Sequence, residues 1–525
     1  MTTPSTDAHL WRQGEPGPGE TVLLPRTANQ ARGLARYCID FLRVPRAIGP
    51  ATLERLEQFH LDSVGCGVSA LALGANAPTV LRDEALATSP SRGTRGGICF
   101  GSAQPCLIEK AVAANASAVR EWDSNGTNFG YDAARGRTAG EFGHNDFYPV
   151  AVAAAREAGL DGTATLRVML LIDEIRGRLA EVFALRKYAI DHVHHGAVAC
   201  AAAYAAALGG TEEQVEAAIG MVVAHSVPYR AIRAGHQLSD SKGASAALAA
   251  EAAVMSGRRA LAGFLGPLDV FRNPLALYRV NEPCADGTSP FDLELGVSGD
   301  AFAIHAMHFK LGLYEHQSAG AIQAIIDLVG SEPTVARDLD GLTAIRVKIY
   351  EPAYSIIADP AKRTPTTRQS ADHSLPYILA RTLLKARTAV AGGLPLDWEG
   401  LMLLPADYSA EAIADPAIGC LIERMSIVPG GPSYDALYPD GIPTSVEIDH
   451  PSRGRLGGTL VQYPLGHARS AAARTAAVVS LKFDRLVAAA VDDPQRLRER
   501  MRVTGRSSEE MAELYAFPIH GCDPG

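Results

Sequence analysis

The chain has 525 residues, which is long enough for a large buried core and for two or three domains. Hydrophobic residues make up 47% and charged residues 20%, a composition typical of a soluble globular protein. The formal net charge is −9 and no basic run is present, so we expect no nucleic-acid partner. An acidic chain can still bind an anionic substrate where Lys, Arg and His side chains converge locally.

Neither the cysteines nor the N-terminal residues indicate secretion. The eight cysteines contain no CxxC pair, which favours reduced thiols in a cytoplasmic enzyme over a disulfide framework or a zinc knuckle. Residues 1–28 lack both an apolar core and a basic start, so we expect a loosely ordered tail rather than a signal peptide. No run of about 18 uninterrupted apolar residues is present, and we predict no membrane span.

From about residue 30 to residue 280 the pattern is helical and rich in alanine. Within it, Thr211 and Gln214 have the spacing of a capping box, directly after a pair of glycines that end the previous helix. Small side chains on several faces let helices pack closely, so we predict a large all-helical domain over residues 29–284. A further helical run begins near Ala471, and we assign residues 465–525 to the same domain.

After Pro283 strand and helix patterns alternate. The segment GLTAIRVKIY alternates and is β-branched, which predicts a strand, and IERMSIVP, TSVEIDH and GTLVQYP are similar. The segment ADHSLPYILARTLLKA has helical spacing, with Pro376 in its first turn. We therefore predict a smaller α+β lid domain over residues 285–464, inserted in a fold that is mainly α.

A polar stretch between two Ala-rich helical runs, residues 120–149, is the first candidate for chemistry. Polar residues that can move protons, on a Gly-rich loop held by two helices, are typical of an active site. The alternative is a surface loop whose Asp and Asn side chains only cap and turn the chain. The polar residues of the stretch are Asp123, Asn125, Thr127, His144, Asn145 and Asp146.

The segment RKYAIDHVHHGAV is the second candidate, with Asp191, His192, His194 and His195 just before a helix. Histidines this close together can share a metal ion, although only Asp191 stands nearby as a further ligand. They can also satisfy the donors of a helix entrance, or one of them can line an anion pocket as a general acid. The sequence leaves these three interpretations open.

Cationic side chains form the remaining candidates. Lys242 falls in the first turn of a predicted helix, where free N–H groups and the helix dipole favour a carboxylate. Arg230 and Arg233 precede it, and Lys310 lies in an otherwise apolar stretch, either snorkelling or reaching into a cleft between domains. Together the candidates supply acid, base and cations, a set suited to proton abstraction beside a carboxylate with departure of a hydroxyl.

These segments resemble the MmgE/PrpD family, which includes 2-methylcitrate dehydratases and cis-aconitate decarboxylases. The resemblance covers most of the chain from about residue 30 onward. Its most specific motifs are Glu121–Thr127 (EWDSNGT) with the later His144, RKYAIDHVHHG, SDSKGASAALAAEAAVMSG, FKLGLYEHQSAGA, TRQSADHSLPY and YPLGH.

The resemblance implies a large helical domain with an inserted lid, an active site between the two, and a homodimer. It also implies dehydration or decarboxylation of a small anionic carboxylate substrate, without cofactor or metal. In the cluster of histidines it favours His195, with His192 and His194 as alternatives. The family's other active-site positions correspond to Asp123, Thr127, His144, Lys242 and Lys310.

Two departures from the family pattern leave the substrate open. The family commonly has an acidic residue immediately before the Thr, where this chain has Gly126. It usually has Pro after the His, where this chain has Asn145 and Asp146. The reaction class suggested by the motifs is compatible with both changes.

We therefore expect a hydro-lyase that acts on a hydroxy-tricarboxylate such as 2-methylcitrate. Asp123 would orient the substrate or act as base, Thr127 would bind it, and His144 with one of the clustered histidines would exchange protons. Arg230 and Arg233 would assist the lysines in holding carboxylates. The alternatives are a decarboxylase of a cis-aconitate-like acid, a His-dependent metal hydrolase, and a non-catalytic ligand-binding relative.

Overall fold

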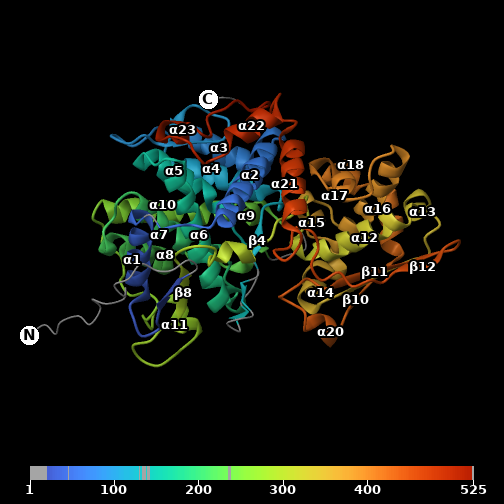
Figure 1. Cartoon of the computed structure of the whole chain (residues 1–525), viewed down its shortest axis with the longest axis horizontal. Coiled ribbons are helices and arrows are strands. Elements are labelled where there is room, and N and C mark those ends of the chain that lie inside the picture. The colour runs from blue at the N-terminus through green and yellow to red at the C-terminus, as the bar shows by residue number, and fades with distance from the viewer. Residues whose placement is uncertain are drawn as a thin grey trace, which may run out of the picture.

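A computed structural model of the chain describes residues 20–44, 46–128, 130–132, 137–138, 142–233 and 238–522. Figure 1 shows a large helical body beside a smaller body in which helices cover a sheet. Helices dominate the described residues, and the prediction of a mainly α fold with an inserted α+β domain is confirmed. The larger body also carries short two-stranded sheets, so it is not helical throughout.

The centre of the large domain is α7 (Val193–Ala207), which is buried along nearly its whole length. It packs against α6 (Gly162–Val182), α8 (Glu212–His225) and α10 (Ser245–Leu261). Alanine occupies most of its positions, and small side chains allow neighbouring helices to approach from all sides. The predicted capping box of Thr211 is present at the start of α8.

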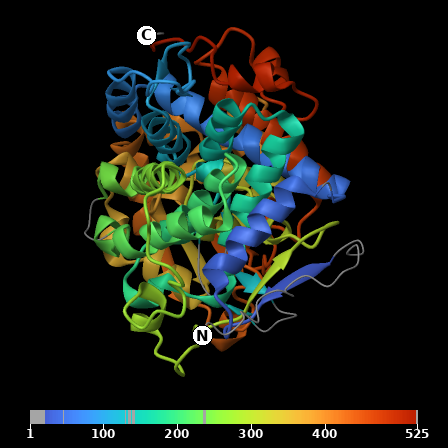
Figure 2. The same cartoon turned by 90° about the vertical axis from the view of Figure 1, so that its left-hand side faces the viewer.

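N-terminal and C-terminal segments complete this domain together. Helix α21 packs against α2, and in Figure 2 the blue N-terminal and red C-terminal segments lie side by side. As predicted, α4 and α5 enclose the polar stretch after residue 120. The helices are α1 (Gln30–Arg43), α2 (Pro50–Ala72), α3 (Asn76–Leu86), α4 (Ile108–Glu121), α5 (Tyr148–Ala158), α21 (Ala472–Val487), α22 (Pro494–Arg500) and α23 (Ser508–Ala512).

A strand, β1 (Thr21–Leu24), lies within the segment for which we expected loose order. It pairs antiparallel with β8 (Leu293–Gly296), and Leu24 is 2% exposed. Strand β8 in turn packs against α6, although the sequence placed it in the lid. The alternation TVLL buries every second residue of β1, so this part of the first 28 residues is held by the large domain.

The lid is built around a four-stranded sheet in the order β10–β9–β11–β12. Strand β10 runs parallel to β9, while β11 is antiparallel to both of its neighbours. Helix α12 (Ala319–Ser331) packs on β11 and on α16 (Leu375–Ala391), which Ser374 caps ahead of Pro376. The strands are β9 (Ala344–Ile349), β10 (Met425–Pro429), β11 (Thr444–His450) and β12 (Gly454–Gly457).

The prediction of a strand in GTLVQYP was wrong. The fourth strand, β12, comes immediately before this segment, and its last residue Gly457 and the following Gly458 have φ of 84° and 88°. Such positive φ values turn the chain out of a regular strand. Only Val461 continues the pairing, as an isolated bridge to Thr444.

No single helix among the described residues is both long and apolar enough to cross a membrane. Helices α2 and α3 satisfy the criteria of length and composition only as a consecutive pair bent by 89°. All eight cysteines lie in the described residues and carry free thiols, in agreement with the expectation of reduced cysteines.

We predict that Leu24→Ala lowers the free energy of unfolding by about 2–5 kcal/mol, the usual result of truncating a buried leucine. The Leu24 side chain contacts the close face of Gly33 on α1, so the cavity left behind cannot easily be filled. Leu23, which is 51% exposed on the same strand, is the matched control. Leu23→Ala should change the unfolding free energy by less than about 0.5 kcal/mol in urea titrations. Equal effects would mean that β1 is not anchored as described.

Candidate active site

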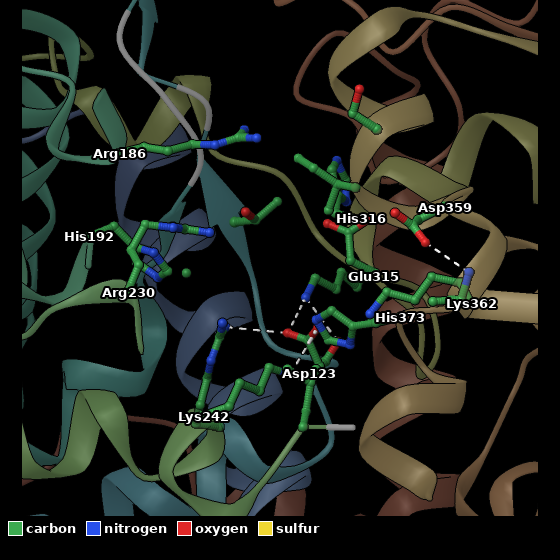
Figure 3. Close-up of a pocket in the computed structure, with 18 residues that line it drawn as sticks. Asp123, Arg186, His192, Arg230, Lys242, Glu315, His316, Asp359, Lys362 and His373 are labelled. Carbon is green, nitrogen blue, oxygen red and sulfur yellow. Dashed lines mark hydrogen bonds and ion pairs between the residues drawn. The ribbon is translucent and has the colours of Figure 1, made fainter. Parts of the chain in front are cut away.

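A cavity of about 490 Å³ lies between the large domain and the lid. Figure 3 shows side chains reaching into it from both sides. The large domain and the segment that leads into the lid contribute Arg120, Asp123, Thr127, Gly143, Arg186, His192, Arg230, Leu238, Lys242, Lys310, Glu315 and His316. The lid contributes Ser355, Ile356, Asp359, Ala361, Lys362 and His373.

Asp123 is the hub of this cavity. Its Oδ1 lies 2.8 Å from Lys310 Nζ, and its Oδ2 lies 3.4 Å from Lys242 Nζ. His373 Nε2 is 2.9 Å from Oδ2, and Arg120 Nη1 is 3.4 Å from Oδ1. One carboxylate therefore gathers basic side chains from four separate segments of the chain.

The backbone and the charge state of Asp123 are both unusual. Its φ is +47°, a left-handed conformation that few residues other than glycine adopt. Burial alone would raise the pKa of its carboxyl group, but Lys242, Lys310 and His373 outweigh that effect and hold the pKa well below its usual range. Asp123 is consequently a fixed negative charge whose oxygens already contact Lys242, Lys310 and His373, which favours the orienting role over that of base.

A third buried lysine supports the floor of the cavity. Lys482, on α21, donates to Asp62 Oδ1 at 2.6 Å, to the Ser124 carbonyl at 2.5 Å and to the Lys310 carbonyl at 2.9 Å. It is 1% exposed. Two of its three hydrogen bonds fix Ser124, which follows Asp123, and Lys310, which bonds Asp123. The C-terminal segment therefore sets the geometry around Asp123.

The residues that depart from the family pattern contact one another beneath the cavity. Asn145 Oδ1 accepts hydrogen bonds from Asn125 Nδ2 at 3.2 Å and from the Gly126 amide at 2.8 Å. A Cβ atom on Gly126 would lie 2.4 Å from His144 Nε2 and 2.7 Å from the Phe59 ring. Glycine is therefore required at this position, because any side chain would displace the rigid rings behind it.

His144 lies behind the Thr127 segment and does not line the cavity. Its ring packs edge-on against Phe59, and Nδ1 is 3.3 Å from Asp173 Oδ1. Asp173 also accepts a hydrogen bond from the Tyr148 hydroxyl. In the part of the chain that the structure describes, Nε2 of His144 has no hydrogen-bond partner. The ring thus backs the site without facing the space available to a ligand.

The structure separates the clustered histidines into two groups. His192 lines the cavity, with Nδ1 3.5 Å from Asp191. His194 contacts the Ser226 carbonyl through Nδ1, and His195 contacts the Phe183 carbonyl through Nε2, at 2.9 and 3.0 Å. Burial lowers the pKa of His194 to about 4 and that of His195 to about 3, so both rings are neutral hydrogen-bond donors to the backbone.

The other residues singled out from the sequence lie at the cavity, with one exception. Thr127 and Arg230 both line it, and Thr127 exchanges two backbone hydrogen bonds with His308. The backbone of Arg233 ends the 3₁₀ helix η3 (Arg230–Arg233), but its side chain lies outside the described residues. The structure thus brings Asp123, Thr127, His192, Arg230, Lys242 and Lys310 together at one cavity.

Sequence reasoning missed His373. It was read only as a polar residue before α16, but its Nδ1 bonds Asp372 Oδ1 while its Nε2 faces Asp123. Asp372 is bound by Arg368, which also pairs with Glu121 at the end of α4. The Asp-His pair within the family motif TRQSADHSLPY was the available signal. This chain of ion pairs ties the lid to the large domain.

Among the described residues, one group of possible metal ligands is present, formed by Asp123, Asp372 and His373. The ligand set does not suit a resident metal ion, because Lys242 and Lys310 already bind the Asp123 oxygens. The clustered histidines at 192–195 are not such a group. The rings of His194 and His195 bond backbone carbonyls of other segments, which argues for a structural role of both residues.

The cavity is positively charged although the protein is acidic. Its described lining holds six Lys and Arg side chains against three carboxylates, a formal excess of three positive charges. The chain as a whole carries −9. This local excess suits a small ligand with several negative charges.

Comparison with known proteins agrees with the motifs. Residues 34–284 match the family model described as the MmgE/PrpD N-terminal domain. This region is an MmgE/PrpD N-terminal domain. The family resemblance drawn from the motifs is therefore confirmed, and the matched range of the MmgE/PrpD domain contains Asp123, Thr127 and Lys242.

Several relatives extend the likeness beyond the MmgE/PrpD domain. The 2-methylcitrate dehydratase of Salmonella typhi is 25% identical over 428 residues, which is 78% of this chain and 80% of that protein. The 2-methylcitrate dehydratases of Escherichia coli strain K12 and of Cupriavidus necator are each 24% identical over 433 residues, with the same coverage. At 78% of the chain, the similarity extends beyond the residues that match the family model.

We predict that Lys482→Met lowers the unfolding free energy by about 3–5 kcal/mol, because it leaves the buried Asp62 without its cation. Arg474→Met is the matched control, since Arg474 is exposed on the same helix. The control should change stability by less than about 0.5 kcal/mol. Urea unfolding of both variants measures the difference, and a Lys482→Met variant as stable as the control would contradict the supporting role.

We predict that His195→Gln changes the pH dependence of stability while leaving turnover within about threefold. The unfolded-state pKa is about 6.5 and the folded-state pKa is about 3, so the native protein loses stability as pH falls through this window. The glutamine amide can keep the bond to Phe183 without taking up a proton. Between pH 7 and pH 5 the variant should lose about 2 kcal/mol less unfolding free energy than the wild type. A turnover loss above ~100-fold in a folded variant would instead restore a catalytic role.

Proposed function

We propose that this protein is a cofactor-free hydro-lyase that dehydrates a small hydroxy-tricarboxylate of the 2-methylcitrate type. The observation that carries the proposal is the Asp123 cluster, a buried carboxylate held by Lys242, Lys310 and His373 inside a cation-rich cavity. The relatives named 2-methylcitrate dehydratase support the same reaction class.

Substrate binding relies on the excess positive charge of the cavity. Lys242 is 2% exposed, so an anion near it is bound with little competition from water. Arg230, from the opposite part of the large domain, adds a planar guanidinium that can bind a carboxylate through two hydrogen bonds. Thr127 provides a hydroxyl at the same wall for the substrate hydroxyl group.

The elimination requires one base and one acid. A base removes a proton from the carbon next to a carboxylate, the C–H electron pair forms the new C=C bond, and the C–O bond breaks. The departing hydroxyl takes a proton from the acid and leaves as water. Cations beside the carboxylate stabilise the negative charge that develops on it during proton removal.

His373 is suited to be the acid. Both of its ring nitrogens face carboxylate oxygens, of Asp372 and of Asp123, so the ring is held at the cavity beside the Asp123 cluster. His316 is suited to be the base, since it lines the same cavity. Burial, together with the nearby charge of Lys310, lowers the pKa of His316 well below its usual range, so the ring is neutral. Asp123 then holds the acid and the lysines in register without exchanging protons.

We predict that Lys242→Ala and His373→Gln each reduce the dehydration of 2-methylcitrate by at least ~100-fold, the typical contribution of one positioned catalytic group. Lys187→Ala is the matched control, because Lys187 is exposed beside the cavity residue Arg186 and does not line the cavity. The control should retain wild-type turnover. Proton NMR of the reaction mixture follows loss of substrate and formation of the alkene in all three variants.

The same assay separates the proposed reaction from its competitors. Release of carbon dioxide from cis-aconitate, with no loss of water from 2-methylcitrate, would identify a decarboxylase instead. Stoichiometric metal in the purified protein, with activity abolished by chelation, would identify a metal-dependent enzyme. Binding of carboxylates without conversion of any would identify a ligand-binding relative.

A further inference from the structure

Two cations of the cavity have no ionic partner among the residues that the structure describes. Lys242 and Lys310 are already paired with Asp123. Arg186 and Lys362 also line the cavity, but within the described residues neither side chain makes an ion pair or a hydrogen bond. Figure 3 shows Arg186 on the large-domain side of the cavity and Lys362 on the lid side.

Both side chains extend from fixed backbones. Arg186 belongs to the 3₁₀ helix η2 (Leu185–Tyr188), and its carbonyl accepts the Ala189 amide at 3.2 Å. Lys362 belongs to η6 (Pro360–Arg363), and its amide donates to the Asp359 carbonyl at 2.8 Å. The two charges are therefore presented to the cavity by ordered segments, one from each domain.

We propose that Arg186 and Lys362 are selectivity residues that bind two of the carboxylates of a tricarboxylate, while Lys242 binds the third. This inference rests on the proposed function and assigns the residues that distinguish tricarboxylates from dicarboxylates. The lining carries a formal excess of three positive charges, which three carboxylates neutralise and two do not. A tricarboxylate can thus pair with both Arg186 and Lys362 while its third carboxylate contacts Lys242.

The proposal also explains why these cations come from opposite domains. Without a ligand, two like charges that face one cavity repel each other, and salt in the solvent screens them only in part. A polyanion that contacts both replaces this repulsion by attraction, which holds the lid against the large domain. A dicarboxylate can satisfy only two of the three cations and gains less from the same contact.

The test measures the affinity of citrate and of malate, which lacks one carboxylate-bearing arm of citrate. Wild-type protein should bind citrate at least ~10-fold more tightly than malate in calorimetric titrations, a difference of about 1.4 kcal/mol. Arg186→Met and Lys362→Met should each reduce this preference to less than threefold, because each weakens the binding of citrate. The affinity for malate should change little in either variant, because two cations remain for its two carboxylates. The double variant should weaken malate as well.

Lys187→Met and Lys348→Met are the matched controls. Each removes one exposed positive charge outside the cavity, Lys187 from the large domain and Lys348 from β9 of the lid. Both should keep the wild-type preference. The proposal is overturned if wild type does not prefer citrate, if a single variant weakens both acids equally, or if the preference survives in both single variants.

The readout is binding, so the outcome does not depend on catalysis. A protein that prefers citrate through Arg186 and Lys362 but eliminates no water would refute the proposed function alone. A dehydratase whose preference survives both substitutions would refute the selectivity assignment alone.

Discussion

The Asp123 carboxylate is the interaction on which the arrangement of this protein depends. It is 2% exposed, and a buried charge is tolerated only when it is paired and hydrogen-bonded. Its partners come from α4, from the short helix α9 (Asp240–Gly243), from the segment that enters the lid and from the lid itself. Removing this one anion would leave Lys242, Lys310 and His373 facing each other as mutually repelling groups. The carboxylate therefore holds the two domains in register at the cavity.

Behind Asp123 the side chains are tightly packed and hydrogen-bonded. In front of it lies the cavity, which is lined by residues of both domains. Lys482, Asn145 and the ring of His144 fill the space behind residues 124–127 with hydrogen bonds and packed side chains. The walls instead carry cations that water or a ligand can reach. A fixed floor with charged walls is the arrangement expected of a preorganised electrostatic site, since the dipoles need not reorganise when charge develops on the substrate.

Periodicity and capping predicted the elements of the fold because both act over a few residues. The helices around the polar stretch, the capping box at Thr211 and the strands β9, β10 and β11 are all local features. The strand expected in GTLVQYP does not form because Gly457, just before the segment, and Gly458, its first residue, both have positive φ. A hydrophobic pattern does not reveal the backbone conformation of glycine. Strand β1 was missed because its partner, β8, lies more than 250 residues away.

The sequence predicted the site residues that belong to family motifs. It missed the residues that are recognised only by their contacts in three dimensions. Family motifs placed Asp123, Lys242 and Lys310 correctly at one cavity. The motifs could not tell which of His192 and His195 lines the cavity. The two residues are about one helical turn apart, and the His192 ring lines the cavity while the His195 ring contacts the Phe183 carbonyl. Nor could the motifs reveal the hydrogen bond from the Gly126 amide to Asn145 Oδ1, which joins the two departures from the family pattern.

The bond from Lys482 to the Lys310 carbonyl joins residues 172 positions apart. On a ribosome that adds roughly 5–20 residues per second, about 10–35 s separate the synthesis of these two lysines. Once His373 has been made, the nascent chain contains Asp123 and every described residue that lines the cavity, but it still lacks the helix that fixes them. The floor of the cavity is thus among the last parts of the molecule to become ordered, and a ribosome that stalls before α21 leaves an incomplete one.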